Sequence, residues 1–258
     1  MNILVCVKQV PDDFAKVHLG ENGKPALDGI DKVVNAFDTY AVEMAVRLCE
    51  NHGGRVVVAT IGAEEEVRPS MVQMIAVGAN QAYIYAPSTA DADESAVAAG
   101  LAELVKKTEE TVGESFDLIM CGKESTDEIS SQVGAMLAEK LNLSFVSSVI
   151  DVKPAEAGLC VRQETEEGSA SYEVFCPAVV TVAKPEYDPR YPNLKSKMAA
   201  RKAVIPYFTD TLSPVQPAVR CISYSEPAKR EAGVKIQEKN AVDAVARAIA
   251  LMADDKVL

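Results

Sequence analysis

Residues 116–141 read FDLIMCGKESTDEISSQVGAMLAEKL, and this stretch decides the expected fold. Its first six residues form a short apolar run that is typical of a buried strand. Apolar residues then recur at the spacing of one helical face, at Ile129, Val133, Met136, Leu137 and Leu141. Between strand and helix lies a loop of small, hydroxyl and amide side chains. Because the first turn of a helix has unpaired backbone N–H groups and a partial positive charge, the loop predicts a site for a polar or anionic ligand.

The first half of the chain alternates short apolar runs with amphipathic segments. Strands are expected at residues 3–7, 55–61, 81–85 and 116–121. Helices are expected between Asp38 and Gly53 and at residues 63–78, 91–107 and 129–141, while residues 18–34 form a loop or small hairpin. Strands that are apolar throughout, alternating with helices, predict a parallel sheet covered on both faces. The fold class is therefore α/β, a Rossmann-like doubly wound sheet whose ligand site lies at the carboxyl ends of its strands.

The second half departs from this alternation. Short strands are expected at residues 146–152, 159–163, 171–175 and 178–183, as an antiparallel addition to the sheet. Residues 184–198 hold three prolines and predict a long loop, which is often functional. Residues 206–238 predict an extended arm, and residues 240–253 a helix with one apolar face. We expect a nucleotide-binding domain over residues 1–205, followed by an arm and a helix over residues 206–258. The arm and helix are expected to dock on a partner subunit. Packing of both on the chain's own domain fits the pattern equally well.

The composition favours a cytoplasmic protein without nucleic-acid or membrane partners. A formal net charge of −12 opposes binding to phosphate backbones, and no apolar run approaches the roughly 20 residues of a membrane span. The chain opens on a strand rather than a signal sequence. Six dispersed cysteines and two histidines show no metal-ligand spacing. Cys6, Cys121 and Cys176 lie in apolar runs, where buried and reduced thiols are expected.

The polar loop admits two interpretations. No GxGxxG or GxxxxGK[ST] motif is present, but backbone N–H groups and the hydroxyls of Ser125, Thr126, Ser130 and Ser131 could hold a nucleotide. Equally, Ser125 and Glu128 have the spacing of a capping box, which needs no ligand. Asp38 could likewise be a helix cap, as could Asn35, or it could bond a ribose. No catalytic constellation can be assembled, so the chain is expected to bind a chemically competent cofactor rather than to supply catalytic side chains.

Four segments together resemble the beta subunit of electron-transfer flavoproteins over nearly the whole chain. ILVCVKQVPD at residues 3–12 resembles the first strand and loop of that family, and VVNAFDTYAVEMAVRL at residues 33–48 resembles its Asn-Pro-x-Asp/Cys segment and helix. CGKESTDEISSQVGAMLAE at residues 121–139 resembles its nucleotide loop. PRYPNLKSKMAARKAVI at residues 189–205 resembles the segment that includes its partner-recognition loop.

The resemblance implies a cofactor site and a partner site. The cofactor site would comprise Cys6, Val7, Lys8, Asn35, Phe37, Asp38, Ile61, Gly122, Lys123, Glu124, Ser125, Thr126, Asp127, Ser130, Ser131, Gln132 and Val133. Asp127, Ser131, Gln132 and Val133 would lie closest to phosphate and ribose, whereas Asp38 and the backbone of residues 7–9 would be nearest to a flavin ring. Leu194, in a loop over residues 184–198, would insert into a dehydrogenase partner.

Three departures from the family pattern bear on the cofactor. Ala36 stands where the family has Pro, Glu124 where Gln is frequent, and Val133 where AMP-binding relatives often have Thr. The Gln132–Val133–Gly134 form resembles the bifurcating branch. In that branch the beta subunit binds FAD that accepts hydride from NADH, one electron passes to ferredoxin or flavodoxin, and the other passes through the alpha-subunit FAD to a dehydrogenase of unspecified kind. The alternatives are a shuttle subunit that binds AMP structurally, a universal-stress-like ATP-binding module, and an interaction subunit with an empty site.

Overall fold

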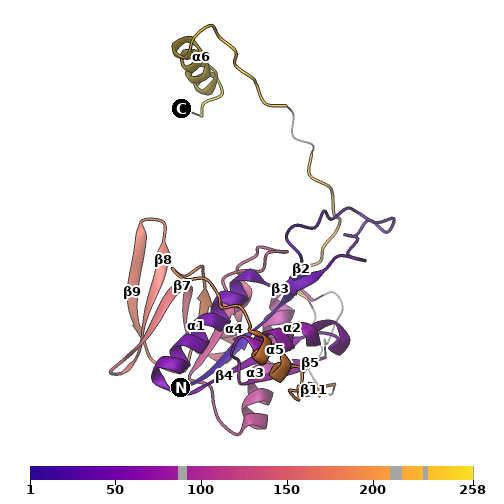
Figure 1. Ribbon diagram of the computed structural model, residues 1–258, viewed down its shortest axis with the longest axis vertical. Coiled ribbons are helices and arrows are strands. Elements are labelled where there is room, and N and C mark those ends of the chain that lie inside the picture. The colour runs from indigo at the N-terminus through magenta and orange to yellow at the C-terminus, as the bar shows by residue number, and fades with distance from the viewer. Residues whose placement is uncertain (87–91, 210–216, 229–231, 258) are drawn as a thin grey trace. The chain divides into compact units, whose positions relative to one another are not determined.

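The computed structural model describes residues 1–86, 92–209, 217–228 and 232–257 (Figure 1). The chain divides into two compact units. The larger contains Met1–Val17 and Ala26–Ile222, and the smaller contains His18–Pro25 and Ser223–Leu258. The larger unit holds the sheet and every element that lines the candidate site.

Among the described residues, the larger unit has a nine-stranded sheet in the order β11-β5-β4-β1-β6-β10-β7-β8-β9. Its strands are β1 (Asn2–Cys6), β4 (Arg55–Ile61), β5 (Gln81–Tyr85), β6 (Leu118–Gly122), β7 (Ser144–Ala155), β8 (Gly158–Thr165), β9 (Gly168–Val174), β10 (Ala178–Val182) and β11 (Tyr207–Phe208). A separate antiparallel pair joins β2 (Gln9–Pro11) to β3 (Lys32–Val34). Strands from β11 through β7 run parallel, and β7, β8 and β9 pair antiparallel at one end.

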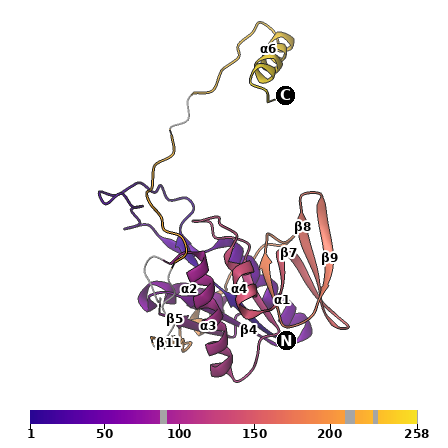
Figure 2. The ribbon, with the colours of Figure 1, turned by 180° about the vertical axis from the view of Figure 1, so that it is seen from behind.

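Helices cover both faces of the parallel sheet. Helices α1 (Ala36–His52) and α2 (Glu64–Ala76) pack on the face that presents Ile3 and Val5, and α5 (Leu194–Ala200) packs on α2. Helices α3 (Glu94–Val112) and α4 (Val133–Leu141) pack side by side on the opposite face, over Leu4 and Cys6. Figure 2 shows this second face toward the viewer. The arrangement confirms the predicted Rossmann-like α/β fold.

The strand order places a topological switch point between β1 and β6. Strand β1 pairs with β4 on one side and with β6 on the other, and all three run parallel. The chain therefore winds outward in opposite directions from these two strands. In doubly wound sheets, the crevice at the carboxyl ends of such a strand pair is the usual ligand site.

Three predictions about the second half of the chain were wrong. Strand β10 was expected to be antiparallel, but it pairs parallel with both β6 and β7. All five of its residues are buried, which is the pattern of a central parallel strand. Residues 184–198 are not loop throughout, since α5 begins at Leu194 with Asn193 as its N-cap. Nor does an arm begin at residue 206, because Tyr207 and Phe208 add β11 to the edge of the sheet beside β5.

The segment that follows β10 is fastened to α1 by a charged cluster. Arg190 contacts Glu43 at 2.8 Å and Glu50 at 2.6 Å, and the Arg47 guanidinium lies 4.0 Å from the centre of the Tyr187 ring. Burial would raise the pKa of Glu43, but hydrogen bonds from Arg190 and Arg47 outweigh it and hold that pKa below its ordinary value. We call Arg190, Glu43, Glu50, Arg47 and Tyr187 the clasp, and it holds the chain that leads into α5.

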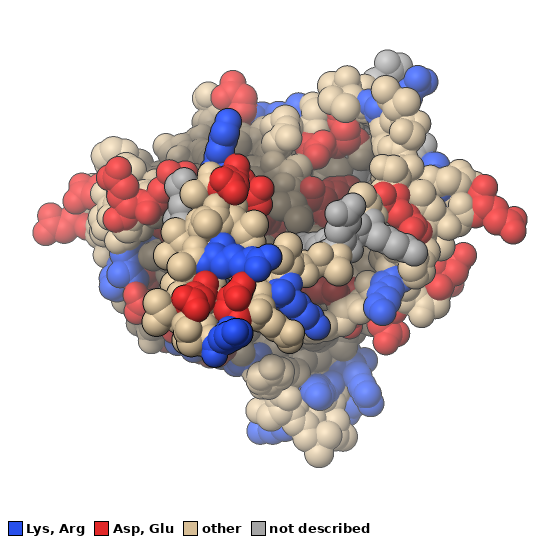
Figure 3. Space-filling view, turned by 90° about the horizontal axis from the view of Figure 1, so that it is seen from above, with Lys and Arg blue, Asp and Glu red and all other residues tan. Residues whose placement is uncertain are grey.

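The smaller unit contains α6 (Ala241–Asp254), with Asn240 as its N-cap. Its expected apolar face is present, and Val242, Val245, Ile249 and Met252 are all exposed. Parts of the connection expected as an arm, including Pro214, lie outside the described residues. No helix in the described ranges is both long and apolar enough to cross a membrane. On the face drawn in Figure 3, acidic and basic side chains are interspersed.

Candidate functional site

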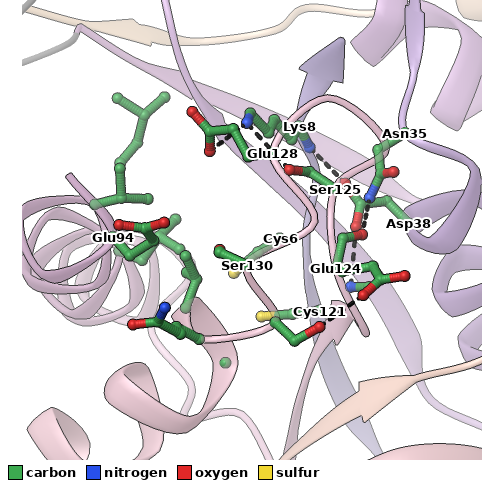
Figure 4. Close-up of a pocket in the computed structure, with 18 of the residues that line it drawn as sticks. Cys6, Lys8, Asn35, Asp38, Glu94, Cys121, Glu124, Ser125, Glu128 and Ser130 are labelled. Carbon is green, nitrogen blue, oxygen red and sulfur yellow. Dashed lines mark hydrogen bonds and ion pairs between the residues drawn. The ribbon is translucent and has the colours of Figure 1, made fainter. Parts of the chain in front are cut away.

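A pocket of about 370 Å³ lies where the carboxyl ends of β1 and β6 meet the first turns of α3 and α4 (Figure 4). Most of the residues predicted for a cofactor site line it. These are Cys6, Val7, Lys8, Asn35, Asp38, Ile61, Gly122, Lys123, Glu124, Ser125, Ser130, Ser131, Gln132 and Val133. Phe37, Thr126 and Asp127 were predicted with them but are not among the lining residues. Segments far apart in the sequence therefore meet at the switch point of the sheet.

Asp38 joins the two strands that carry the pocket. It lies in the first turn of α1, and its carboxylate accepts the backbone N–H of Lys8 at 2.6 Å and that of Gly122 at 2.9 Å. Burial raises the pKa of Asp38 to about 7, although the bonds from Lys8, Asn35 and Gly122 partly oppose this rise. Because both oxygens already accept backbone donors, the carboxylate fixes the pocket rather than projecting into it.

Asn35 fastens the loop that follows β6. It occupies the N-cap position of α1, but its side chain makes no capping bond to that helix. The amide donates to the carbonyl of Glu124 at 2.9 Å and accepts the N–H of Thr126 at 3.2 Å. A buried carboxamide can satisfy a donor and an acceptor at once, so Asn35 fixes the backbone of residues 124–126.

Gly122 has no room for a side chain. A Cβ at this position would overlap Oδ1 of Asp38 and would lie 2.8 Å from the Cβ of Phe37. The start of α1 and the end of β6 can approach each other only because this residue is glycine. Phe37 therefore shapes the site from behind, through its contact with Gly122.

The sequence predicted that a helix begins near Ile129, but residues 123–132 form a loop between β6 and α4. Helix α4 begins at Val133, so the expected start near Ile129 was wrong, as was a capping box formed by Ser125 and Glu128. Ile129 and Ser131 have φ values of 53° and 55°, and the Ile129 side chain is 65% exposed. A β-branched residue rarely adopts this left-handed conformation, so the surrounding structure must hold the loop.

Lys8 crosses the mouth of this loop. Its ammonium contacts Asp127 at 2.9 Å, Glu128 at 3.0 Å and the Ser125 hydroxyl at 3.3 Å. Burial would lower the pKa of Lys8, but the bonds to Asp127 and Glu128 outweigh it and raise that pKa. The Asp127 carboxylate therefore faces Lys8 rather than the pocket. Lys8, Ser125 and Glu128 line the pocket, and Asp127 does not.

The sequence prediction missed one wall of the pocket. Helix α3 and the residues before it contribute Ala92, Asp93, Glu94, Ala96, Val97, Gly100 and Leu101. Asp93 caps α3 by accepting the N–H of Ala96 at 2.9 Å, and its other oxygen accepts the N–H groups of Ala218 and Val219. The sequence does carry a signal for this cap, because Asp93 lies near the start of a predicted helix. The sequence does not show that α3 lies beside α4, since that position follows from the strand order.

The pocket offers the groups that a phosphorylated ligand needs. The first-turn N–H groups of α4 have no partner within the helix, and Gln132, Val133 and Gly134 line the pocket there. In the loop beside them, Ser125 and Ser130 line the pocket, whereas the buried Oγ1 of Thr126, which has no hydrogen-bond partner, lies outside the lining. The apolar side chains of Val97, Leu101 and Ile61 form the remaining walls. In the described part of the chain no cluster of three or more His, Cys, Asp or Glu residues could hold a metal ion.

Leu194 lies apart from the pocket lining, at the start of α5. Asn193 caps this helix by accepting the N–H of Ser196 at 2.8 Å, and the Leu194 side chain is 75% exposed. Tyr191, just before it, is also exposed, and the clasp residue Arg190 precedes Tyr191. The Leu194 side chain is therefore accessible, and its role as a partner contact stays a prediction.

The fold and the pocket define the class of this protein as a doubly wound α/β protein with a nucleotide-sized pocket at its switch point. The family model for the electron transfer flavoprotein domain matches residues 26–213. The chain belongs to the electron transfer flavoprotein family.

Three relatives illustrate the similarity. The chain is 34% identical over 239 residues to the electron transfer flavoprotein subunit beta of Syntrophomonas wolfei, covering 93% of this chain and 91% of that protein. It is 33% identical over 205 residues to the caffeyl-CoA reductase-Etf complex subunit CarD of Acetobacterium woodii, covering 78% and 75%. It is 28% identical over 265 residues to the subunit beta of Bacillus subtilis, covering 100% of both chains.

Proposed function

We propose that this chain is the beta subunit of a heterodimeric electron-transfer flavoprotein and that its pocket holds the adenylate portion of FAD. The observation that carries the proposal is the joint fastening of β1, α1 and β6 by Asp38 at the switch point of the sheet. This fastening gives the pocket a fixed floor beside the N-terminus of α4. Family membership supplies the class of cofactor, and the pocket supplies a place for its nucleotide.

The residues present fit an adenine nucleotide. The N–H groups of the first turn of α4, at Val133 and Gly134, are donors suited to phosphate, and the Ser130 hydroxyl lines the pocket beside them. The apolar wall that includes Val97 and Leu101 suits a flat ring. We assign phosphate contacts to the segment from Ser130 to Val133, and we assign the floor of the site to Cys6 and Gly122. Glu124 holds the Ser131 hydroxyl at 2.7 Å and thereby shapes that segment.

We further propose that the subunit takes part in flavin-based electron bifurcation. Bound FAD would supply hydride acceptance from NADH and transfer of electrons to ferredoxin or flavodoxin and, through the alpha-subunit FAD, to a dehydrogenase. The chain's own contribution would be to orient the nucleotide and to set the charge beside it through Lys8, Glu124 and Lys123. Similarity to a subunit of a caffeyl-CoA reductase-Etf complex supports this version.

A second candidate is a non-bifurcating shuttle whose beta subunit binds AMP as a structural group. The volume of the pocket favours it, because about 370 Å³ is near the lower end of the roughly 300–1,000 Å³ of small-molecule sites. FAD would have to extend beyond the enclosed space, whereas AMP would not. The two candidates share the same phosphate and adenine contacts and differ in what lies beyond the first phosphate.

Nucleotide extraction from the purified heterodimer separates these candidates. The proposal predicts two FAD molecules per heterodimer, one of which is lost when the pocket of this chain is disrupted, and biphasic reduction of the flavins by NADH. One FAD and one AMP per heterodimer would exclude bifurcation but keep the shuttle. A heterodimer without nucleotide in this chain would exclude both.

We propose two kinds of partner. The alpha subunit is the obligatory one, and the docking of residues 206–258 on it stays a prediction. A flavin-dependent dehydrogenase would receive Leu194, which the clasp presents at the start of α5. Because none of the six cysteines, all of which lie in the described residues, forms a disulfide, we propose the reducing cytoplasm as the place where these partners meet.

A further inference from the structure

Cys6 and Cys121 both line the floor of the pocket. The proposed function assigns no chemistry to either thiol. They end adjacent parallel strands, and they follow the register pair Val5 and Met120. Both side chains belong to the core cluster on the α3 and α4 face of the sheet, so they project in the same direction. Both residues line the pocket, and Figure 4 shows their sulfur atoms there.

The two thiols are neighbours on adjacent strands and on the same face of the sheet. The neighbouring Cys6 thiol, together with burial, raises the pKa of the Cys121 thiol well above its ordinary value. Neighbouring strands are about 4.8 Å apart, which lies within the roughly 4.4–6.8 Å between the Cα atoms of disulfide-bonded cysteines. On the far side of each strand, Cys6 faces Ala59 and Cys121 faces Thr181, so each cysteine has only the other as a sulfur neighbour across the sheet.

Access to these thiols runs through the pocket. Cys6 and Cys121 are only 6% and 7% exposed, because the sheet lies behind them and α3 and α4 cover their face. A nucleotide in the pocket would cover the exposed remainder. An empty pocket would leave the pair open to a small reagent, whereas the exposed Cys176 and Cys221 would react in either state.

We propose that Cys6 and Cys121 form a dithiol site that a small hydroperoxide closes to a disulfide when the pocket is empty, and that bound nucleotide shields. The shielding rests on the proposed function, whereas the dithiol itself does not. In the reaction two S–H bonds break and one S–S bond forms. The two electrons and two protons pass to hydrogen peroxide, whose O–O bond breaks to give two water molecules. The protonated state of Cys121 makes this reaction slower than oxidation of an exposed thiol.

The test uses the full-length heterodimer with Cys176→Ser and Cys221→Ser, so that exposed thiols of this chain do not interfere. Bound nucleotide is removed with a chaotrope, the chain is refolded, and its circular dichroism is compared with that of untreated protein. Hydrogen peroxide is then added with and without FAD or AMP. Peptide mapping without reductant follows the species in which the peptides of Cys6 and Cys121 are joined with loss of two hydrogen atoms.

The joined peptide should form in the emptied protein. At a nucleotide concentration about 100 times Kd its rate of formation should fall roughly 100-fold, because the open fraction falls in that proportion. A further Cys49→Ser change is the matched control, since the half-buried Cys49 thiol contacts the Met1 carbonyl and should leave the result unaltered. A further Cys6→Ser change should abolish the joined peptide.

Three outcomes separate this inference from the proposed function. Absence of the joined peptide in correctly refolded, empty protein overturns the dithiol site. A joined peptide that forms equally fast with nucleotide bound, as calorimetry would verify, overturns the shielding and leaves the proposed function intact. Failure of both nucleotides to bind overturns the proposed function, while the oxidation of the empty protein still decides the dithiol site.

Discussion

The carboxylate of Asp38 accepts the backbone N–H of Gly122 at 2.9 Å, although 84 residues separate them. The same carboxylate accepts the N–H of Lys8, so one side chain joins the carboxyl ends of β1 and β6. The ladder between β1 and β6 sets the spacing of the strands, and Asp38 fixes the backbone where the two strands end. The geometry of the pocket therefore depends on the acceptor capacity of Asp38.

Asp38→Asn should weaken nucleotide binding more than it weakens folding. The carboxamide has one oxygen, so one of the N–H groups of Lys8 and Gly122 would face an NH2 group instead of an acceptor. An unsatisfied buried donor costs about 1–3 kcal/mol, which corresponds to roughly fivefold to 150-fold weaker binding if the strand ends shift to relieve it. Removal of the buried charge offsets part of the loss in stability.

Calorimetry with FAD and AMP measures the affinity, and urea unfolding measures the stability. The exposed Asp31→Asn change removes the same charge and is the matched control, with no expected change in either quantity. Equal affinity in the Asp38→Asn and parent proteins would show that Asp38 does not position the pocket.

The stability of the protein should depend on pH through Asp38 in the direction opposite to that of most carboxylates. Its pKa is about 7 in the folded state and 3.8 in its ordinary state, so between these values the folded protein holds a proton that the unfolded chain has released. The contribution of Asp38 to the free energy of unfolding therefore rises as pH falls from about 7 toward 4. Above pH 7 the full cost of the buried charge is present.

A difference measurement isolates this contribution. The free energy of unfolding is measured for the parent and for Asp38→Asn across that pH range, and other titrating groups cancel in the difference. The parent should gain stability relative to the variant as pH falls. A constant difference would mean that Asp38 has an ordinary pKa in the folded protein.

Gly122→Ala should destabilise the protein by about 1–3 kcal/mol, the usual cost of forcing atoms into a packed site. The new Cβ would overlap the Asp38 carboxylate and approach Phe37, so α1 or β6 must move. Gly233→Ala is the matched control, because a Cβ there meets nothing within 4 Å. Urea unfolding compares the two variants, and similar stability for both would contradict the close approach at Gly122.

The sequence predicted the parallel core of the sheet because continuous apolar strands and short helices are local patterns. It could not predict that β10 enters between β6 and β7, since consecutive short strands look the same whether they form a hairpin or cross over. Ile129 matched the helical period by chance. In the structure it is exposed and has a left-handed backbone conformation, which depends on tertiary contacts of the loop that the sequence does not show. The α3 wall was missed for a related reason, because its position follows from strand order rather than from any motif.

The clasp should control the order of the segment that leads to Leu194. Arg190→Ala removes the contacts to Glu43 and Glu50, which hold residues 187–193 against α1, and leaves the buried Glu43 with Arg47 alone. Hydrogen exchange at residues 187–193 should become faster, with a loss of about 1–3 kcal/mol in stability. Arg162→Ala is the control, since its partner Glu186 is largely exposed. Unchanged exchange at residues 187–193 in the Arg190 variant would exclude the clasp as their anchor.

Leu194→Ala should slow electron transfer to a dehydrogenase without altering the fold. The side chain is 75% exposed and packs on no core, so its removal should change the stability by less than about 0.5 kcal/mol. As an interface anchor it would instead contribute about 2 kcal/mol or more to binding, which is roughly a 30-fold rise in KM for the flavoprotein with kcat little changed. Dehydrogenase assays with the co-purified partner measure this KM. Val204→Ala, at a residue beyond α5 that is 85% exposed, is the matched control, and the same KM in both variants would remove Leu194 from the interface.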